Sequence, residues 1–377
     1  MKIAMIGHKR IPGRSGGVEV VVEELSTRMA QKGHEVVAYN RHCGEEKLKD
    51  YRGVKIIEVR TFKSSALNAM VYSLFATLRC VGKKYDVVHY HAEGPCAMIP
   101  LAKLFGKRVV ATVHGLDWQR GKWGGFASKY IFFGEKMAAK FADQVIVLSN
   151  NVQNYFKKTY GCNAVFVPNG INPVTPEAPD LIRQKFGLEK DSYILFLARI
   201  TTEKGLDYLI DAYKALQTDK KLVIAGSIEP QTEYIASVLE KAKGNDNIIF
   251  TDFVSGKTLA ELFSNCFVYV LPSDIEGMPM SLLEAVGYGA PVIVSDIPEN
   301  TDCLSGYGHA FAHSDSEDLK RVLEHCLAHE ALKAQDFKED TTPEQVALQR
   351  AALKQKYDWD NITDQTIEIY QSVQKKK

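Results

Sequence analysis

The sequence predicts an α/β protein made of two doubly wound domains, and three observations lead to this prediction. Short β-branched runs alternate with amphipathic helical stretches along the whole chain, which is typical of parallel sheets with crossover helices. Several runs, such as 193–197 and 267–271, are continuously apolar, as expected for strands buried on both faces. With 377 residues, the chain is long enough for two domains rather than one.

The expected strands fall into two series. The first comprises 2–7, 34–40, 55–60, 86–91, 108–114, 143–149 and 164–167, and the second comprises 193–199, 221–226, 247–251, 267–271 and 291–295. A first helix follows the first strand, with apolar residues at helical spacing and charged residues on the other face, and Gly33 ends it. These residues are Val18, Val22, Leu25 and Met29 on the apolar face and Glu23, Glu24 and Arg28 on the other.

A proline-rich segment without periodicity, Pro168 to Pro179, marks the linker between the domains. We therefore expect an N-terminal domain over 1–170, a second domain over 171–355 and a C-terminal helix within 356–377. That helix packs back on the N-terminal domain or lies on the second one, and the sequence does not decide. Ligands of doubly wound sheets bind beyond the carboxyl ends of the strands, so two facing domains would place the site in the cleft between them.

The composition narrows the class of protein. Lys plus Arg number 47 and Asp plus Glu number 46, which gives no reason to expect nucleic acid as a partner. The seven cysteines include no C-x-x-C pair, so we expect reduced thiols in the cytoplasm and no zinc site. The chain has no run of about 18 uninterrupted apolar residues, which predicts no membrane span, and its N-terminal apolar run is too short for a signal peptide.

The most informative segment, Glu276 to Glu284, reads E-G-M-P-M-S-L-L-E, follows a buried strand and opens a helix. Gly277 and the backbone after it can approach a ligand closely, and free N–H groups at the helix start can meet hydroxyls or phosphates. The two carboxylates can accept hydrogen bonds from the vicinal hydroxyls of sugar and ribose rings. Ser281 and Glu284 also fit a capping box, in which Glu284 only satisfies a backbone N–H. By spacing alone, both interpretations stand.

Other polar residues follow strands of the two series. Arg199 ends one strand and Lys204 comes five residues later; the two cations can clamp a diphosphate or be a solvated pair. His114 ends another strand, where it can donate to a sugar hydroxyl, handle a proton or be structural. Gly16 and Gly17 precede the first helix, and they can expose backbone N–H groups to a phosphate or form a flexible turn.

His89 and His91 alternate on one expected strand and so share a face. Their spacing suits a metal, but no third ligand stands nearby in the sequence, so we interpret them as cleft-lining or structural. The D-x-D sequence at 358–360 is interpreted as a helix start. We therefore expect no metal and no cofactor, with cationic side chains and a helix dipole in their place.

Taken together, these motifs resemble glycosyltransferase family 4, whose members are retaining enzymes with the GT-B fold, two doubly wound Rossmann-like domains facing a cleft. The resemblance extends over nearly the whole chain and rests on E-G-M-P-M-S-L-L-E-A at 276–285, R-x-x-x-x-K-G at 199–205, G-G-V-E at 16–19 and P-N-G at 168–170. It implies an enzyme that transfers a sugar from a nucleotide-diphosphate donor.

The resemblance also implies roles for single residues. The implied catalytic residues are His114, Arg199, Lys204 and Glu276. The implied donor-binding residues are Gly16, Gly17, Asn169, Val254, Gly277, Met278, Pro279, Met280 and Glu284. The expected acceptor-binding residues are Asp117, Trp118 and Arg120. The leaving diphosphate, held by Arg199 and Lys204, would help to accept the proton of the acceptor on the same face of the sugar.

The opening M-K-I-A-M-I-G-H-K-R-I-P and the stretch H-G-L-D-W-Q-R at 114–120 resemble the bacterial capsule and cell-wall rhamnosyltransferases of that family. This narrower resemblance implies dTDP-L-rhamnose as donor and a glycan or polyprenyl-linked acceptor in surface polysaccharide synthesis. The alternatives are a UDP-sugar-using hexosyltransferase of the same fold, a nucleotide-sugar epimerase and a non-catalytic protein that binds sugar nucleotides.

Two stretches, 64–84 and 119–133, combine apolar or aromatic residues with cations. Such stretches can rest on an anionic membrane surface, which would make this cytoplasmic protein peripheral at the inner face of the plasma membrane. A core helix with a basic solvent face is the other interpretation of 64–81, and the same choice stands for 119–133. The oligomeric state is not indicated by the sequence.

Overall fold

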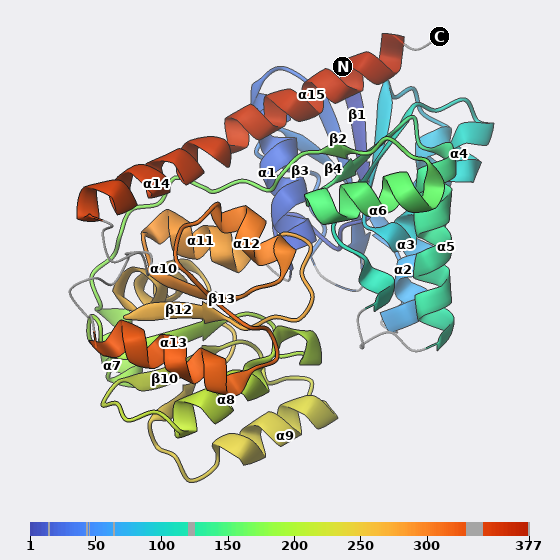
Figure 1. Ribbon diagram of the computed structural model, residues 1–377. Coiled ribbons are helices and arrows are strands. Elements are labelled where there is room, and N and C mark those ends of the chain that lie inside the picture. Colours follow the sequence, from blue (N-terminus) through green and yellow to red (C-terminus); the bar gives the residue numbers. More distant parts are fainter. Residues whose placement is uncertain are drawn as a thin grey trace. The chain divides into compact units, whose positions relative to one another are not determined.

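The structure, a computed structural model, describes residues 1–13, 16–42, 44, 46–62, 65–119, 125–328 and 342–375. It consists of two compact units (Figure 1). The first unit comprises Met1–Gly170 and Asp358–Lys377, and the second comprises Ile171–Tyr357. The chain therefore leaves the first unit after Gly170 and returns to it after Tyr357.

Within the described residues, the first unit has an eight-stranded sheet with the order β3-β4-β2-β1-β5-β6-β7-β8. Neighbouring strands are parallel, apart from the antiparallel pair β3 and β4. The seven expected strands of this half are confirmed, and β3 is an addition. The strand bounds are β1 Lys2–Ile6, β2 Glu35–His42, β3 Asp50–Tyr51, β4 Val54–Arg60, β5 Val87–His91, β6 Val109–Val113, β7 Gln144–Val147 and β8 Val165–Phe166.

The helices of the first unit cover this sheet with buried apolar residues, among them Tyr72, Cys80 and Ile99. None of the helices in the described part of the chain combines the length and the apolar character needed to cross a bilayer. The bounds are α1 Gly17–Gln31, α2 Ser65–Val81, α3 Glu93–Cys96, α4 Ile99–Leu104, η1 Asp117–Gln119, α5 Gly125–Phe141, α6 Asn150–Tyr160 and α15 Trp359–Lys375.

The charged face of α1 is not a solvent face, because Glu23 and Glu24 are buried like the apolar residues of the helix. Glu23 accepts hydrogen bonds from the hydroxyl of Tyr51 at 3.1 Å and from the N–H of Gly13 at 3.3 Å. Glu24 forms an ion pair with Arg28 one turn later. Buried carboxylates are tolerated where such partners compensate for lost hydration, and helical periodicity does not show which charged residues will find them.

The outer face of α2 also differs from the basic solvent face considered for 64–81. Tyr72 and Cys80 face the core, whereas the exposed side carries Leu74, Phe75 and Leu78, which are 37%, 47% and 45% exposed. The middle of this helix therefore presents apolar side chains outward. On α5, Phe126 and Phe133 are exposed as well, and residues 120–124 of the stretch 119–133 lie outside the described residues.

In the described part of the second unit, six parallel strands follow the order β11-β10-β9-β12-β13-β14. The five expected strands of this half are confirmed, and β14 is an addition. The strand bounds are β9 Tyr193–Leu197, β10 Lys221–Ala225, β11 Ile248–Phe250, β12 Val268–Leu271, β13 Val292–Ser295 and β14 His309–Phe311. The helix bounds are α7 Leu181–Phe186, η2 Thr202–Lys204, α8 Leu206–Lys214, α9 Glu233–Ala242, α10 Gly256–Asn265, α11 Met280–Tyr288, α12 Pro298–Leu304, α13 Ser316–Ala328 and α14 Pro343–Lys356.

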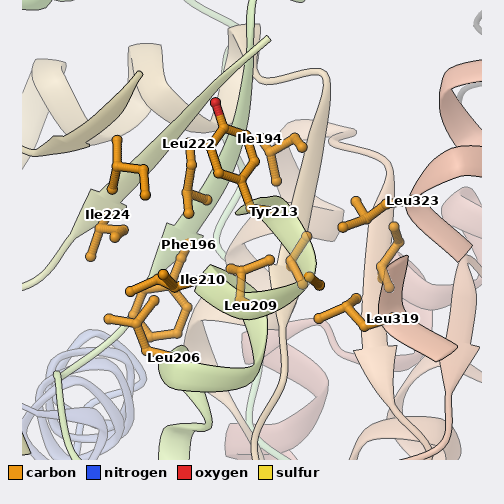
Figure 2. Packing of buried hydrophobic residues seen from close by; sticks show 14 of the residues in the cluster. Ile194, Phe196, Leu206, Leu209, Ile210, Tyr213, Leu222, Ile224, Leu319 and Leu323 are labelled. Atoms are coloured by element: carbon orange, nitrogen blue, oxygen red, sulfur yellow. The ribbon is translucent and has the colours of Figure 1, made fainter. Parts of the chain in front are cut away.

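The core of the second unit holds α8 on the sheet (Figure 2). Leu206 and Leu209 of α8 are completely buried among side chains of β9, including Phe196, and Leu319 and Leu323 of α13 belong to the same cluster. Burying such side chains stabilises a fold by about 1.5–3 kcal/mol each. This packing fixes the start of α8, and therefore the turn just before it, which carries Lys204.

The C-terminal helix α15 belongs to the first unit, where it packs against α1. The carboxylate of Asp358 accepts hydrogen bonds from the N–H groups of Asp360 and Asn361, both at 3.0 Å, so 358–360 is a helix start as predicted. Trp359 is buried against Gly170, where an added Cβ would lie 2.4 Å from the indole ring. Close approach of this ring is therefore the reason for a glycine at 170.

Candidate functional site

Several predicted residues of the second unit gather where its strand order reverses. β9 and β12 are hydrogen-bonded neighbours, while β10 and β11 lie on one side of them and β13 and β14 on the other. The carboxyl end of β9 leads to Arg199 and Lys204, and that of β12 leads to Glu276. Such a reversal point is where doubly wound sheets bind their ligands.

Lys204 and Glu276 form an ion pair at this point. Nζ of Lys204 bonds to Oε1 of Glu276, and both residues are only 8% exposed. Oγ of Ser273 donates to the same carboxylate oxygen at 2.7 Å. The ammonium and the carboxylate compensate for each other's lost hydration. An anionic ligand would therefore meet a cation that is already oriented and largely dehydrated.

Gly205 lets the two strand-end loops approach each other. Its φ is +60°, and an added Cβ would lie 2.1 Å from the carbonyl oxygen of Pro272. The N–H of Asp274 donates to the carbonyl of Glu203 at 3.0 Å, and the Asp274 carboxylate accepts from the hydroxyl of Ser314 at 2.8 Å. The close packing of the two loops beside the ion pair thus explains why a glycine follows Lys204 in the R-x-x-x-x-K-G motif.

Ser281 and Glu284 do not form a capping box. α11 begins at Met280 after Pro279 in an extended conformation, and its N-terminus has no side-chain cap. Ser281 lies inside the first turn, with its Oγ 2.8 Å from the hydroxyl of Tyr269, and Glu284 is half-buried one turn further on. The N-terminal N–H groups of α11 are therefore available to an anion.

The charges of both carboxylates of the motif act on Tyr269. Its fully buried phenol has a raised pKa, first because of burial and then because of the charges of Glu276 and Glu284. Its hydroxyl also lies 3.3 Å from the carbonyl oxygen of Leu197 at the end of β9. The hydroxyl of Tyr269 therefore links the first turn of α11 to the end of β9.

The other predicted residues of this unit differ in their exposure to solvent. Arg199 is exposed, Met280 is half-buried, and Gly277, Met278 and Pro279 are buried. Val254 is half-buried in the segment after β11, at the edge of the sheet. Glu276, which pairs with Lys204, comes shortly before the start of α11 in the sequence. Val254 is not part of this group, because it follows β11, which is two strands away from β9 in the sheet.

In the first unit, the strand order reverses between β1 and β5, and His114 follows the next strand, β6. His114 is 9% exposed, and its Nε2 lies 3.2 Å from Nδ1 of His91 at the end of β5. The ring of His91 lies 4.0 Å from that of His89, which confirms that these two share a face. His89 in turn contacts the hydroxyl of Tyr370 at 2.6 Å and Oγ1 of Thr112 at 2.7 Å.

Burial keeps these inner histidines neutral. It lowers the pKa of His89 to about 3 and that of His91 well below the usual value, and neighbouring histidines lower both further. Among the described residues, no group of three or more His, Cys, Asp or Glu side chains is arranged to hold a metal ion. The neutral rings can exchange hydrogen bonds with one another and with a ligand.

The glycine loop lies at the same edge of the sheet. α1 begins at Gly17, and Gly16 precedes it with an extended backbone and no side-chain cap. The segment before the loop is held by Asn40, whose side chain bonds to the N–H and the carbonyl of Ile11 at 3.1 and 2.9 Å and to His8 at 3.0 Å. The N-terminus of α1 is therefore held in place with N–H groups that an anion can use.

Two buried carboxylates hold the expected acceptor residues. Glu93 accepts from the N–H of Asp117, and Glu135 accepts from the indole N–H of Trp118, both at 2.9 Å. Burial, and next the charges of Asp117 and Glu135, raise the pKa of Glu93 well above its usual value. Arg120 lies outside the described residues. Asp117 and Trp118 are thus placed by contacts to α3 and α5.

Asn169 is buried at the end of the first unit, directly before Gly170. The predicted site residues in the described part therefore form two groups, one in each unit.

Sequence reasoning missed several residues that contact the predicted ones. Ser273 bonds to Glu276, Tyr269 touches Ser281, and Glu93 holds Asp117. His91 was interpreted only as cleft-lining or structural. The sequence did hold a signal for Ser273 and His91, because each follows or ends a strand at its carboxyl end. The strand of Ser273 lies beside the one that leads to Lys204, and the strand of His91 lies beside the one that leads to His114. Glu93 gave no such signal.

Comparisons with known proteins cover nearly the whole chain. The family model described as Glycosyltransferase Family 4 matches residues 15–174, and that described as Glycosyl transferases group 1 matches residues 179–342. Alpha-maltose-1-phosphate synthase of Mycolicibacterium smegmatis is 26% identical, over 99% of this chain and all of that protein. An O-antigen biosynthesis glycosyltransferase of Escherichia coli is 22% identical, over 79% of this chain and 81% of its own.

Among solved structures, the HepE protein of Anabaena in complex with UDP-glucose is similar in fold. The two chains are 15% identical, and the likeness covers 99% of this chain and 100% of the other with a TM-score of 0.79. This likeness confirms the predicted GT-B fold. With both halves matched by glycosyltransferase family models and this fold throughout, the chain is a glycosyltransferase of the GT-B type.

Proposed function

We propose that this glycosyltransferase moves a sugar from a nucleotide-diphosphate donor to a glycan or polyprenyl-linked glycan, with retention of the anomeric configuration. The observation that carries the proposal is the buried Lys204–Glu276 pair beside the uncapped start of α11. A cation, a carboxylate and helix N–H groups at one place suit the diphosphate and the hydroxyls of such a donor.

In the proposed reaction, Lys204 and Arg199 bind the diphosphate, Glu276 accepts from donor-sugar hydroxyls and Glu284 accepts from the ribose. The bond from the sugar carbon to the diphosphate oxygen breaks, and the acceptor hydroxyl forms the new bond on the same face. Its proton passes to the leaving diphosphate oxygen. The cations neutralise the charge that develops there, and this is why we propose metal-independent transfer.

Residues of the first unit complete the proposal. His114 acts on the reacting sugar through its ring, Gly16 and Gly17 offer backbone N–H groups to phosphate, and Asp117 and Trp118 bind the acceptor. The motif resemblance favours dTDP-L-rhamnose as donor. The fold likeness to a protein solved with UDP-glucose favours a UDP-hexose as the second candidate. The E. coli relative supports an acceptor in surface polysaccharide synthesis.

A donor panel separates these candidates. We expect one of dTDP-L-rhamnose, UDP-glucose and a GDP-sugar to raise the melting temperature specifically, because a ligand that binds only the folded state stabilises it. Incubation with that donor alone tests the epimerase alternative, since a transferase without acceptor leaves the sugar configuration unchanged. Stabilisation by none of the donors would contradict the proposal.

Lys204→Ala tests the role of the ion pair. We expect turnover to fall by about a hundredfold or more, because the variant loses a cation at the leaving group. Lys220→Ala is the matched control, since Lys220 is equally buried at 8% exposure but donates to the carbonyl of Asp191. The rate of sugar transfer at saturating donor is measured for both. Undiminished turnover of Lys204→Ala would remove this residue from the mechanism.

We also propose that the protein rests on an anionic membrane surface. The support is the exposed apolar row Leu74, Phe75 and Leu78 on α2, together with Arg79 beside it. An apolar face flanked by cations is what such a surface binds.

A further inference from the structure

A row of buried side chains in contact with one another ends at His114, and the function proposed above gives no role to the other members of the row. Four buried side chains from three segments of the first unit follow one another in the order Tyr370, His89, His91 and His114. Tyr370 comes from α15, and 281 positions separate it from His89. His91 is the member that touches His114 directly.

The contact between His91 and His114 couples the protons of the two rings. Nδ1 of His91 and Nε2 of His114 are 3.2 Å apart, so one of these nitrogens carries the proton and the other accepts it. The remaining nitrogen of His91, Nε2, is buried and has no hydrogen-bond partner within the described residues. Unpaired buried donors are rarer than unpaired acceptors, which places the proton of His91 on Nδ1. His114 then accepts at Nε2 and carries its own proton on Nδ1.

His89 and Tyr370 prevent His91 from turning away. Both ring nitrogens of His89 are engaged, by Tyr370 and by Thr112, and the ring lies against that of His91. His89 and Tyr370 are completely buried, so water does not compete for these bonds. The ring of His91 is therefore held on one side by His89 and on the other by His114.

We propose that His91 is a positioning residue, which fixes the ring orientation and the tautomer of His114, and that His89 and Tyr370 act through it. The inference rests on the proposed role of His114 in sugar transfer. It gives the C-terminal helix a functional contribution, since α15 supplies the side chain that starts the row.

Two substitutions at His91 separate hydrogen bonding from packing. The amide of Asn can occupy the place of the Nδ1–H, whereas Leu fills a similar volume without a donor. We expect His91→Leu to lower kcat by about ten- to a hundredfold, as misplacement of a catalytic group does, with little change in the KM for donor. His91→Asn should recover most of the loss, and equal activity of both variants and the wild type would overturn the proposal.

A pair of tyrosine variants provides the matched control. Tyr370→Phe removes the hydroxyl that holds His89, and Tyr90→Phe removes an equally buried hydroxyl that pairs with Thr77 at 2.9 Å. Tyr90 lies on β5 between the two histidines but faces the opposite side of the sheet. Similar losses of melting temperature are expected for both, and a fall in kcat only for Tyr370→Phe. Equal kcat values would contradict the proposed row.

Nuclear magnetic resonance of the ring nitrogens gives a readout that does not depend on activity. We expect the ¹⁵N shifts of the Nδ1–H tautomer for His114 in the wild type and a mixture of tautomers in His91→Leu. An unchanged tautomer would overturn the positioning role. If His114→Leu remained active while the tautomer shifted in His91→Leu, the proposed role of His114 would fail and the positioning inference would stand.

Discussion

Glu93 and Glu135 are two buried carboxyl groups with different hydrogen-bond environments. Glu135 accepts from the indole of Trp118 and from the hydroxyls of Tyr155 and Tyr160, which compensates for the burial of its charge. Glu93 accepts from a single N–H, and its Oε1 has no partner within the described residues. Burial and the neighbouring carboxylates therefore raise the pKa of Glu93 well above its usual value.

Glu93→Gln should make the protein more stable than the wild type at neutral pH. The pKa of Glu93 is raised in the folded state, so its ionisation opposes folding as pH rises from about 4.5, the ordinary value. Gln does not titrate, and it keeps an oxygen for the N–H of Asp117. The gain in the free energy of unfolding should appear above pH 4.5 and grow until the folded-state pKa is passed. Urea unfolding at a series of pH values measures it.

Glu135→Gln is the control for that prediction. Its carboxylate accepts three hydrogen bonds, so its loss should destabilise the protein at neutral pH rather than stabilise it. A difference between Glu93→Gln and the wild type that did not vary with pH would show that Glu93 is ionised in the folded protein.

At the scale of elements, α2 and α11 show that the surroundings of a helix determine how it is capped and which of its faces are exposed. α11 begins at Met280 without a side-chain cap, although its sequence contains a capping signature, because Pro279 and the loop before it set the first turn. α2 packs Tyr72 and Cys80 inward and still leaves an apolar row outside. The hydrophobic pattern alone does not distinguish a helix buried on two sides from one with a second apolar face.

Phe75→Ser with Leu78→Ser should weaken binding to vesicles that contain anionic lipid by about tenfold or more, since two large apolar side chains no longer enter the interface. Leu348→Ser is the control, because Leu348 is 69% exposed on α14 of the second unit. Co-sedimentation with phosphatidylglycerol and phosphatidylcholine vesicles measures the binding. Unchanged binding of the double variant would exclude α2 as the membrane contact.

For the whole molecule, buried histidines set the response to acid. Burial lowers the pKa of His8 to about 4 and of His89 to about 3, and that of His91 also falls, all in the first unit; His309, at about 4, lies in the second. These groups bind protons more readily when unfolded. Their stabilising effect is therefore complete above pH 6.5 and is lost as pH falls toward the folded-state values.

We expect acid to unfold the first unit before the second. Each such histidine adds at most about 1.4 kcal/mol of destabilisation per pH unit below 6.5, and three of the four named belong to the first unit. Glu93 has a raised pKa, so its effect on the stability of the first unit becomes more favourable as pH falls toward 4.5. This makes the loss of stability with falling pH less steep, but we expect the loss to remain. Calorimetry between pH 7 and 4.5 measures the transition of each unit. A second-unit transition that fell faster would contradict the prediction.

The sequence by itself determined the fold class, twelve of the strands and the polar residues at strand ends. It did so because the alternation of apolar strands with helices is a local pattern, and because parallel strands bring their carboxyl ends to one edge. Lys204 and Glu276 follow two such strands, and the resemblance to glycosyltransferase family 4 singled them out; they stand 72 positions apart and form an ion pair.

Only the tertiary structure decided which polar side chains are partners. The burial of Glu23 and Glu24, the raised pKa of Glu93, the contact of His91 with His114 and the return of α15 to the first unit all depend on neighbours that are remote in sequence. A buried polar group is stable only with a partner of suitable geometry, and such partners come from packing rather than from any local pattern. For that reason candidate binding residues could be named from the sequence, and the residues that hold them in place could not.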